Sequence, residues 1–146
     1  MGERTEGSIT IEAKAAEILD VITDFAAYPD WVDGIRSAEV RVKDGDGRAA
    51  AVAFSFSTMG LSADYTLSYQ YAPGDGGVSW TTLEAEGAVK DIRGEYVLEP
   101  DGDETLVTYR LELELSMPVP GLFRRQGEKR AVKTALDGLK RRVEGG

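Results

Sequence analysis

The 146-residue sequence contains no cysteine and no histidine. Without cysteine the chain can form no disulfide bond and has no thiol nucleophile, and without either residue it lacks the usual ligands of zinc. Histidine is also the side chain that most often transfers protons near neutral pH. These absences exclude cysteine- and histidine-based catalysis, and we expect a protein that works without a metal or other cofactor.

Long hydrophobic runs are absent as well. No apolar segment is long enough to span a bilayer, and the first eight residues, MGERTEGS, contain no hydrophobic stretch of the signal-peptide kind. We therefore expect no stable membrane insertion and a cytoplasmic location. The formal net charge of -9 opposes binding to phosphate backbones, so nucleic acid is not an expected partner.

One short segment runs against this negative charge. Five cations fall within ten residues near the C-terminus: Arg124, Arg125, Lys129, Arg130 and Lys133. Such a cluster is most often the solvated face of a helix, and we favour that interpretation. Contact with an anionic ligand or a lipid surface is the alternative.

The composition is typical of a folded globular protein, because 42% of the residues are hydrophobic and 29% are charged. The length is close to the commonest domain size and allows a substantial core. We predict a single domain over residues 1–146, present as a monomer or homodimer.

The first part of the chain predicts one strand and two helices. Residues 5–12 alternate, with Ile9 and Ile11 on one side, as in a half-buried strand. From about residue 14 the apolar residues follow helical spacing and predict a helix of about three turns, carried by Ala15, Ile18, Leu19, Ile22 and Phe25. Pro29 can start a short second helix that Gly34 closes.

Six further strands are predicted after residue 34, because turn residues separate the alternating segments. The Asp-Gly-Asp-Gly run at residues 44–47 is the clearest of these turns. The predicted strands cover residues 35–43, 48–57, 61–71, 78–83, a segment between Gly87 and Pro100, and residues 105–115. Each strand has a sequence neighbour beside it, which is typical of an antiparallel meander. Asp101, Asp103 and Glu104 belong to a turn rather than to a metal site.

Alternation also assigns a face to each strand residue. We expect one set to point towards the C-terminal helix: Tyr65, Leu67, Tyr69, Tyr96, Leu98, Tyr109, Leu111 and Leu113. The opposite face should be solvated and should carry Asp64, Arg93, Glu95, Arg110 and Glu112.

Residues 118–144 predict one long helix whose apolar stripe is interrupted. The second half repeats apolar residues at three- and four-residue steps: Val132, Ala135, Leu136, Leu139 and Val143. The same face, followed backwards, meets Glu128, Lys129 and Arg125 before it becomes apolar again at Leu122. Either a wet cavity lies under the first half of the helix, or the helix tilts away or bends at Gly127 and leaves these charges in solvent.

This order of elements resembles the helix-grip fold of the START and birch-pollen-allergen-like (SRPBCC) superfamily. Residues 21–31, VITDFAAYPDW, are similar to the helix-to-helix signature of the bacterial polyketide cyclase/dehydrase and lipid-transport family, and Gly94-Glu95-Tyr96 and residues 105–109 add to the likeness. The resemblance implies an α+β fold in which a seven-stranded curved antiparallel sheet wraps a long C-terminal helix. It also implies two short helices between strands 1 and 2, and a pocket for an apolar ligand between sheet and helix.

The resemblance gives the aromatic residues of the strands a candidate role as the pocket lining. Apolar rings with a few polar tips would suit a flat or lipid-like ligand. Ordinary core packing is the alternative for any one of these rings. The predicted ligand-binding residues are Phe54, Phe56, Tyr65, Tyr69, Trp80, Tyr96, Tyr109, Leu122, Arg125, Gln126 and Lys129.

Three functions fit these observations. The leading hypothesis is binding or transport of a small hydrophobic or aromatic molecule, without a cofactor. The second is an enzyme of the cyclase, aromatase or dehydratase type, in which a polar side chain assists enolisation or dehydration. The third is an adaptor that binds another protein through the outer face of the sheet or through the helix. Fold alone does not choose among them.

Overall fold

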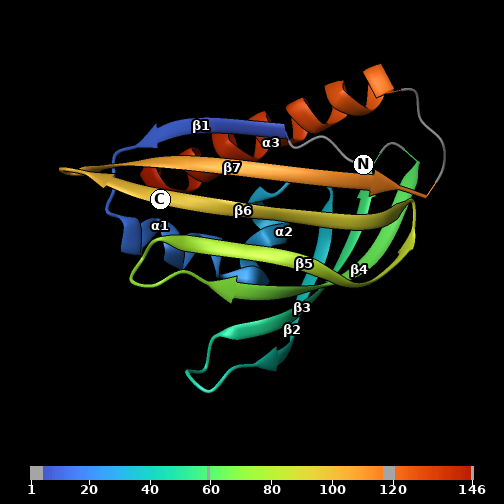
Figure 1. Ribbon diagram of the computed structural model, residues 1–146, viewed down its shortest axis with the longest axis horizontal. Coiled ribbons are helices and arrows are strands. Elements are labelled where there is room, and N and C mark those ends of the chain that lie inside the picture. The colour runs from blue at the N-terminus through green and yellow to red at the C-terminus, as the bar shows by residue number, and fades with distance from the viewer. Residues whose placement is uncertain (1–4, 59, 117–120, 146) are drawn as a thin grey trace.

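The architecture is a curved antiparallel sheet crossed by a long C-terminal helix (Figure 1). It comes from a computed structural model that describes residues 5–58, 60–116 and 121–145, without the side chains of residues 121–124. In this described part seven strands form one sheet in the order β1-β7-β6-β5-β4-β3-β2. The bounds are β1 (Thr5–Ile11), β2 (Ile35–Lys43), β3 (Ala49–Thr58), β4 (Leu61–Tyr71), β5 (Gly77–Gly87), β6 (Val89–Asp101) and β7 (Glu104–Leu115). The predicted antiparallel meander and the helix-grip fold are confirmed.

Turn chemistry explains why the strands follow one another so closely. Between β2 and β3 the Asp44 carboxylate accepts hydrogen bonds from the backbone N–H groups of Asp46 (2.8 Å) and Arg48 (3.0 Å). Gly47 completes this turn at a φ of 82°, which a residue with a side chain rarely adopts. The sequence prediction for this hairpin is therefore confirmed in its mechanism as well as in its position.

The helices between β1 and β2 are shorter than predicted. The structure has α1 (Ala15–Ile22), the 3-10 turn η1 (Phe25–Ala27) and α2 (Tyr28–Trp31). The prediction of three turns for the first helix was wrong, because α1 ends after two turns. Thr23 donates from both its backbone N–H (2.9 Å) and its hydroxyl (2.8 Å) to the carbonyl of Leu19, which closes the last turn. The chain then turns at Asp24 and places Phe25 in the core.

Strand β5 is longer than predicted and contains a bulge. Its partners on β4 shift between Thr66, which pairs with Glu84, and Leu67, which pairs with Thr82. The extra residue, Leu83, is 60% exposed. A bulge exchanges the two faces of a strand, so inward and outward residues swap positions after Leu83. The predicted strand therefore ended at Leu83, although the strand continues to Gly87.

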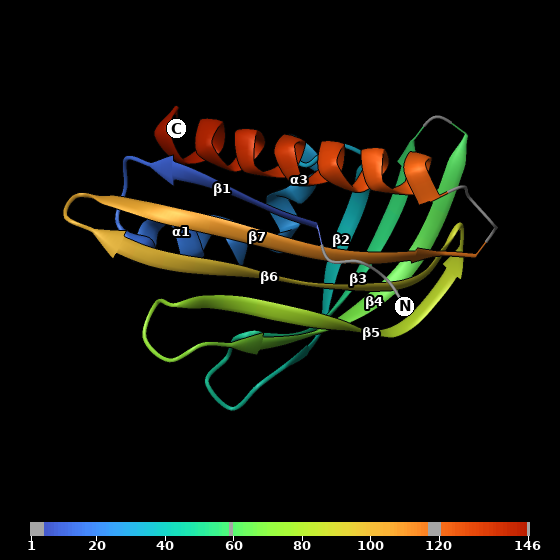
Figure 2. The ribbon, with the colours of Figure 1, turned by 45° about the horizontal axis from the view of Figure 1, so that its top comes forward.

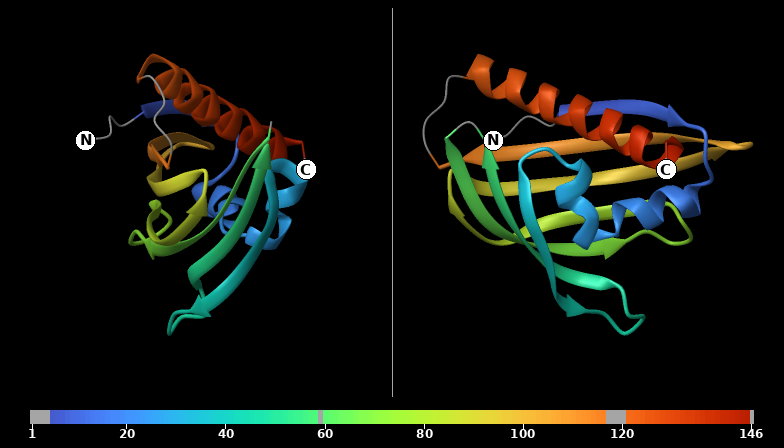
Figure 3. Two further views of the ribbon diagram at one scale, coloured as in Figure 1. Left: turned by 90° about the vertical axis from the view of Figure 1, so that its right-hand side faces the viewer. Right: turned by 180° about the vertical axis from the view of Figure 1, so that it is seen from behind.

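The core lies on the concave side of the sheet, between the strands and the helices α1 and α3 (Gly121–Glu144) (Figures 2 and 3). Its fully buried apolar residues come from six elements, with Ile11, Ile22, Phe25, Val52, Val107 and Leu139 as one example from each. The predicted faces are confirmed, because every residue expected to face inward is buried or half-buried. Of the residues expected to face water, Asp64 and Arg93 are exposed and the other three are half-buried.

Helix α3 packs along β1, although the two elements stand at opposite ends of the sequence (Figure 2). The Lys140 ammonium donates to the carbonyl of Thr10 (2.7 Å), and the backbone N–H of Glu12 donates to the Glu144 carboxylate (2.8 Å). Gly7 makes this packing close, because a Cβ atom there would lie 2.7 Å from Cγ1 of Val132. The second half of α3 is thereby fixed against the sheet.

Candidate functional site

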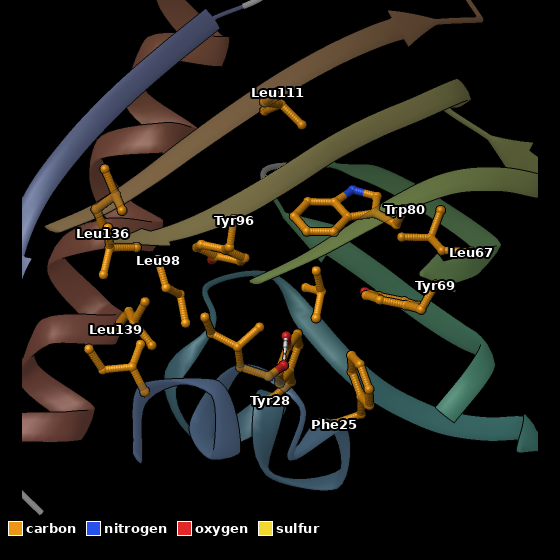
Figure 4. Packing of buried hydrophobic residues seen from close by; sticks show 14 of the residues in the cluster. Phe25, Tyr28, Leu67, Tyr69, Trp80, Tyr96, Leu98, Leu111, Leu136 and Leu139 are labelled. Carbon is orange, nitrogen blue, oxygen red and sulfur yellow. Dashed lines mark hydrogen bonds between the residues drawn. The ribbon is translucent and has the colours of Figure 1, made fainter. Parts of the chain in front are cut away.

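A continuous array of aromatic rings covers the concave face of the sheet (Figure 4). Phe25, from η1, lies against Tyr69 of β4, with 4.8 Å between the ring centroids. Tyr69 contacts Trp80 of β5 (5.8 Å), and Trp80 contacts Tyr96 of β6 (5.6 Å). Tyr96 stacks on Tyr109 of β7 at 4.6 Å and 16°. Side chains from four neighbouring strands therefore form one surface.

A second branch of the array runs along β3 and β4. Phe25 meets Phe54 (6.1 Å), and Phe54 meets Tyr65 (5.6 Å). Phe56 is half-buried and its ring covers Gly34, where any side chain would collide with it. The structure thus brings together all seven aromatic residues that the sequence analysis selected on the strands.

Burial changes along the concave face. At the end covered by α1 and α2 the inward residues are fully buried, as Val52, Leu67 and Leu98 are. At the other end, where β7 finishes and α3 begins, several inward residues are only half-buried, while Ala63 and Leu111 beside them are buried. The half-buried residues are Phe56, Tyr65, Ile92, Tyr109, Leu113 and Leu115. Both groups occupy the same face, so the difference reflects incomplete cover under the first half of α3.

Tyr65 and Tyr109, at this half-covered end, are both partly desolvated and partly accessible to water. Burial raises the pKa of both phenols well above the usual value of about 10. Both side chains nevertheless remain partly accessible to water. Both side chains are therefore surrounded by protein atoms without being closed off from water.

The phenol hydroxyls of this surface differ in their hydrogen bonding. The Tyr28 hydroxyl donates to the backbone carbonyl of Ile22, and this buried group is thereby satisfied. Four others make no hydrogen bond to another residue that the structure describes: Tyr65, Tyr69, Tyr96 and Tyr109. Within the same part of the chain the one fully buried side-chain polar atom without a partner is Nε1 of Trp31. The four hydroxyls therefore border space that water can enter.

The residues predicted on α3 do not lie where the sequence analysis placed them. Arg125, Gln126 and Lys129 are exposed, so their expected inward position is wrong, and the inward charged residue is Glu128, which is 1% exposed. The reason is the helical rotation of 100° per residue, which turns Lys129 outward once Glu128 and Val132 face the sheet. The side chain of Leu122 lies outside the described residues.

Glu128 closes the seam between α3 and the sheet. Its carboxylate accepts a hydrogen bond from the Thr5 hydroxyl of β1 (3.2 Å) and another from the backbone N–H of Leu113 on β7 (3.1 Å). Leu113 belongs to the half-covered end of the concave face, so Glu128 lies beside that end. Glu128 stands four residues before Val132, so the helical spacing placed it on the inner face of α3. Its charge argued against that position.

Three depressions of the surface are open grooves outside the core. One of about 310 Å³ lies between β1 and α3, and Lys129 and Lys133 line it beside Gly7 and Leu136. The other two lie on the outer face of the sheet, at about 250 and 340 Å³. In the described part of the chain no group of three or more carboxylates is placed to hold a metal ion. No helix among these residues has the length and apolar character needed to cross a membrane.

Comparison of sequences identifies one family. Residues 3–144 match the family model described as polyketide cyclase/dehydrase and lipid transport. The match covers almost the entire chain, including every strand and helix of the structure. No curated protein sequence matches the chain.

Comparison of structures finds the same architecture in proteins of low sequence identity. A START superfamily protein from Mycobacterium smegmatis superposes with a TM-score of 0.90 at 22% identity, over 99% of both chains. The Zhui aromatase/cyclase from Streptomyces sp. R1128 gives 0.80 at 18%, over 99% of this chain and 94% of that one. A STAR-related lipid transfer protein from Xanthomonas axonopodis gives 0.72 at 18%, over 96% and 85%. At these identities the similarity concerns the fold.

Proposed function

The chain belongs to the polyketide cyclase/dehydrase and lipid-transport family. On this basis we propose that it binds a small hydrophobic ligand at the half-covered end of the concave face, in a recess beneath the first half of α3. The ligand would lie on the rings of Tyr65, Tyr96 and Tyr109, with Ile92 and Leu113 beside them. The proposed role is binding or transport in solution, without a cofactor.

One observation carries this proposal. At one end of the concave face six inward aromatic and aliphatic side chains are half-buried, beside the buried Ala63 and Leu111, although they occupy the same face as the closed core. Apolar side chains in a recess are the usual lining of small-molecule sites, because a ligand there removes apolar surface from water. The half-buried residues are contributed by β3, β4, β6 and β7, which matches a site formed by a sheet rather than by one loop.

Binding is favoured over proton-transfer catalysis because the tyrosine phenols stay protonated. Burial raises the pKa of Tyr65, Tyr69, Tyr96 and Tyr109, so each phenol is protonated at neutral pH and does not serve as a base. The buried carboxylate of Glu128 already accepts two hydrogen bonds from the protein. Neutral phenols remain suited to donate hydrogen bonds to a ligand.

The proposal is tested by filling the recess. Leu113→Trp adds an indole at the half-covered end, and we expect it to weaken binding of the neutral apolar dye Nile red by about tenfold or more. The affinity is measured by fluorescence titration. The matched control is Leu106→Trp, because Leu106 lies on the same strand, is 37% exposed and faces away from the recess.

The control should bind the dye as the unmodified protein does. Both variants are first compared with it by circular dichroism, so that a loss of binding is not confused with a loss of fold. Equal dye affinity in all three proteins, or no dye binding by the unmodified protein, would contradict the proposed function.

A further inference from the structure

Strand β1 forms one edge of the sheet, and its free side faces α3 (Figure 2). The Lys140 ammonium donates to the carbonyl of Thr10 (2.7 Å), and the Glu144 carboxylate accepts from the backbone N–H of Glu12 (2.8 Å). Both backbone groups point away from β7, so these two side chains of α3 take the place of a neighbouring strand. They do so only where β1 ends.

The earlier part of the same edge is open. In an antiparallel strand the N–H and C=O of one residue point to one side, and those of the next residue point to the other. Since Thr10 points towards α3, Ser8 and Glu6 do so as well. Strand β7 agrees, because the N–H of Leu113 points to the β1 side and β7 pairs its odd-numbered residues with the odd-numbered residues of β1. No residue that the structure describes is a strand partner on the α3 side, and no side chain among them bonds to the backbone of Glu6 or Ser8.

The groove of about 310 Å³ between β1 and α3 follows this open edge. Residues 5–9 line it on the side of β1. Helix α3 contributes the apolar side chains of Val132 and Leu136 and the charged side chains of Lys129, Lys133 and Asp137. Unpaired backbone groups therefore face a mixture of apolar and charged side chains across the groove.

Positive charge prevails on the α3 side of the groove. Asp137 is paired with Lys133 (2.8 Å), whereas Lys129 forms no ion pair with any residue that the structure describes. The Glu6 carboxylate is held by Arg110 on the outer face of the sheet. The groove thus offers an uncompensated cation, although the formal net charge of the chain is -9.

We propose that this groove binds an extended, acidic peptide segment of another protein, which adds to β1 as an eighth strand of the sheet. A strand is the ligand that offers N–H and C=O groups at the two-residue spacing of Glu6 and Ser8. A carboxylate side chain of the segment pairs with Lys129. The groove lies outside the concave face of the sheet, so this inference goes beyond the proposed function and does not depend on it.

The test compares two acetylated and amidated hexapeptides, one in which Thr and Glu alternate and one in which Thr and Lys alternate. Their affinities for the unmodified protein are measured by isothermal titration calorimetry at low ionic strength. We expect the Glu peptide to bind at least about tenfold more tightly, although the net charge of the protein attracts the Lys peptide. Equal affinities, tighter binding of the Lys peptide, or no binding of the Glu peptide would overturn the proposal.

Amide hydrogen exchange, followed by nuclear magnetic resonance, locates the bound peptide. The amides of Glu6 and Ser8 should exchange about tenfold or more slowly when the Glu peptide is bound, because each N–H gains an acceptor. The amides of β2, at the other edge of the sheet, are the control and should exchange as before. Unchanged exchange at Glu6 and Ser8 would show that the peptide does not add to β1.

A pair of variants separates the groove from the overall charge of the helix. Lys129→Glu should weaken binding of the Glu peptide by about tenfold, because it places a like charge in the groove. The matched control is Arg130→Glu, which makes the same change of charge at the next residue, also exposed but not part of the groove lining. It should alter the affinity by less than about twofold. An equal loss in both variants would mean that the peptide responds to the charge of α3 as a whole, and the groove would then not be its site.

Discussion

Glu128 is the residue whose position most affects the site. Its carboxylate is buried and accepts hydrogen bonds from two neutral groups, and no cation lies in ion-pair contact with it among the described residues. Burying a carboxylate is unfavourable, and hydrogen bonds from a hydroxyl and a backbone amide offset this only in part. The gain is structural, because one side chain of α3 joins both β1 and β7 beside the half-covered end of the concave face.

Removing this carboxylate should destabilise the protein. In Glu128→Ala the backbone N–H of Leu113 and the hydroxyl of Thr5 lose their acceptor, and we expect the free energy of unfolding to fall by about 1–3 kcal/mol. The measurement is urea unfolding followed by circular dichroism. Glu17→Ala is the control, because Glu17 is an exposed carboxylate on α1, and it should cost only a few tenths of a kcal/mol. An equal effect of both changes would show that the Glu128 hydrogen bonds contribute nothing.

The sequence placed both Glu128 and Lys129 near the inner face of α3, but it did not show which of the two points inward. Counting back from Val132 by three or by four residues reaches Lys129 or Glu128, and both steps belong to the same helical stripe. The choice depends on the rotation of α3 about its own axis, which is set by Gly7 and the packing of Leu136. Those contacts come from a strand more than 100 residues away and leave no local signal.

At the scale of elements, α3 has two halves with different environments. From Val132 onwards its inner residues pack on β1, α1 and α2, and Gly138 lies against the backbone of Trp31. Before Val132 the described side chains are exposed, apart from Glu128. Gly127 lies in this first half, where a Cβ atom would meet nothing within 4 Å. Glycine in an exposed helix interior is unfavourable relative to alanine.

The two glycines should respond differently to the same substitution. Gly127→Ala should raise the free energy of unfolding by about 0.5–1 kcal/mol, because it improves helix propensity without a contact. Gly138→Ala should give no such gain, since its Cβ would lie 3.3 Å from the carbonyl oxygen of Trp31. Urea unfolding of both variants measures the difference. A larger gain at Gly138 than at Gly127 would contradict the packing described for the second half of α3.

Elements with regular alternation were predictable to the residue. The bounds predicted for β2 and β4 agree with the structure, because turns with clear residue preferences flank both strands. The extension of β5 to Gly87 was not predictable, since the bulge at Leu83 reverses the order of faces. The end of α1 was missed because a hydrogen bond from the Thr23 side chain, rather than a proline or glycine, closes the helix.

At the scale of the whole molecule, burial shifts the pKa of all six tyrosines in the same direction. Burial raises the pKa of all six: Tyr28, Tyr65, Tyr69, Tyr71, Tyr96 and Tyr109. In the unfolded chain each phenol loses its proton near pH 10, whereas in the folded protein it keeps the proton to a higher pH. Above pH 10 loss of these protons therefore lowers the free energy of the unfolded chain but not that of the folded protein.

We accordingly expect the protein to be stable up to about pH 10 and to lose stability as the pH rises further. The tyrosines should ionise together with unfolding rather than one by one. Tyrosinate absorbance and far-ultraviolet circular dichroism, followed in the same alkaline titration, measure this directly. Gradual appearance of tyrosinate near pH 10 with an unchanged dichroism spectrum would contradict the buried aromatic array.

The gathering of the aromatic residues was predictable, but the half-covered end was not. Alternation places Tyr65, Tyr96 and Tyr109 on one face, because β4 connects to β7 through pairings that lie before the bulge of β5. How much of that face is covered depends on sheet curvature and on the course of α3. Both are properties of the assembled molecule, and no single segment of the sequence encodes them.

The position of β1 has a consequence for folding during synthesis. Thr5 pairs with Leu111, and the hydroxyl of Thr5 bonds to Glu128, so the first strand finds its partners only after almost the whole chain has been made. The meander from β2 to β7 can form as it leaves the ribosome, because its strands pair with sequence neighbours. Until α3 has been made and packs against the sheet, part of the aromatic face lies open, and a nascent chain is then most exposed to aggregation or to a chaperone that binds apolar surfaces.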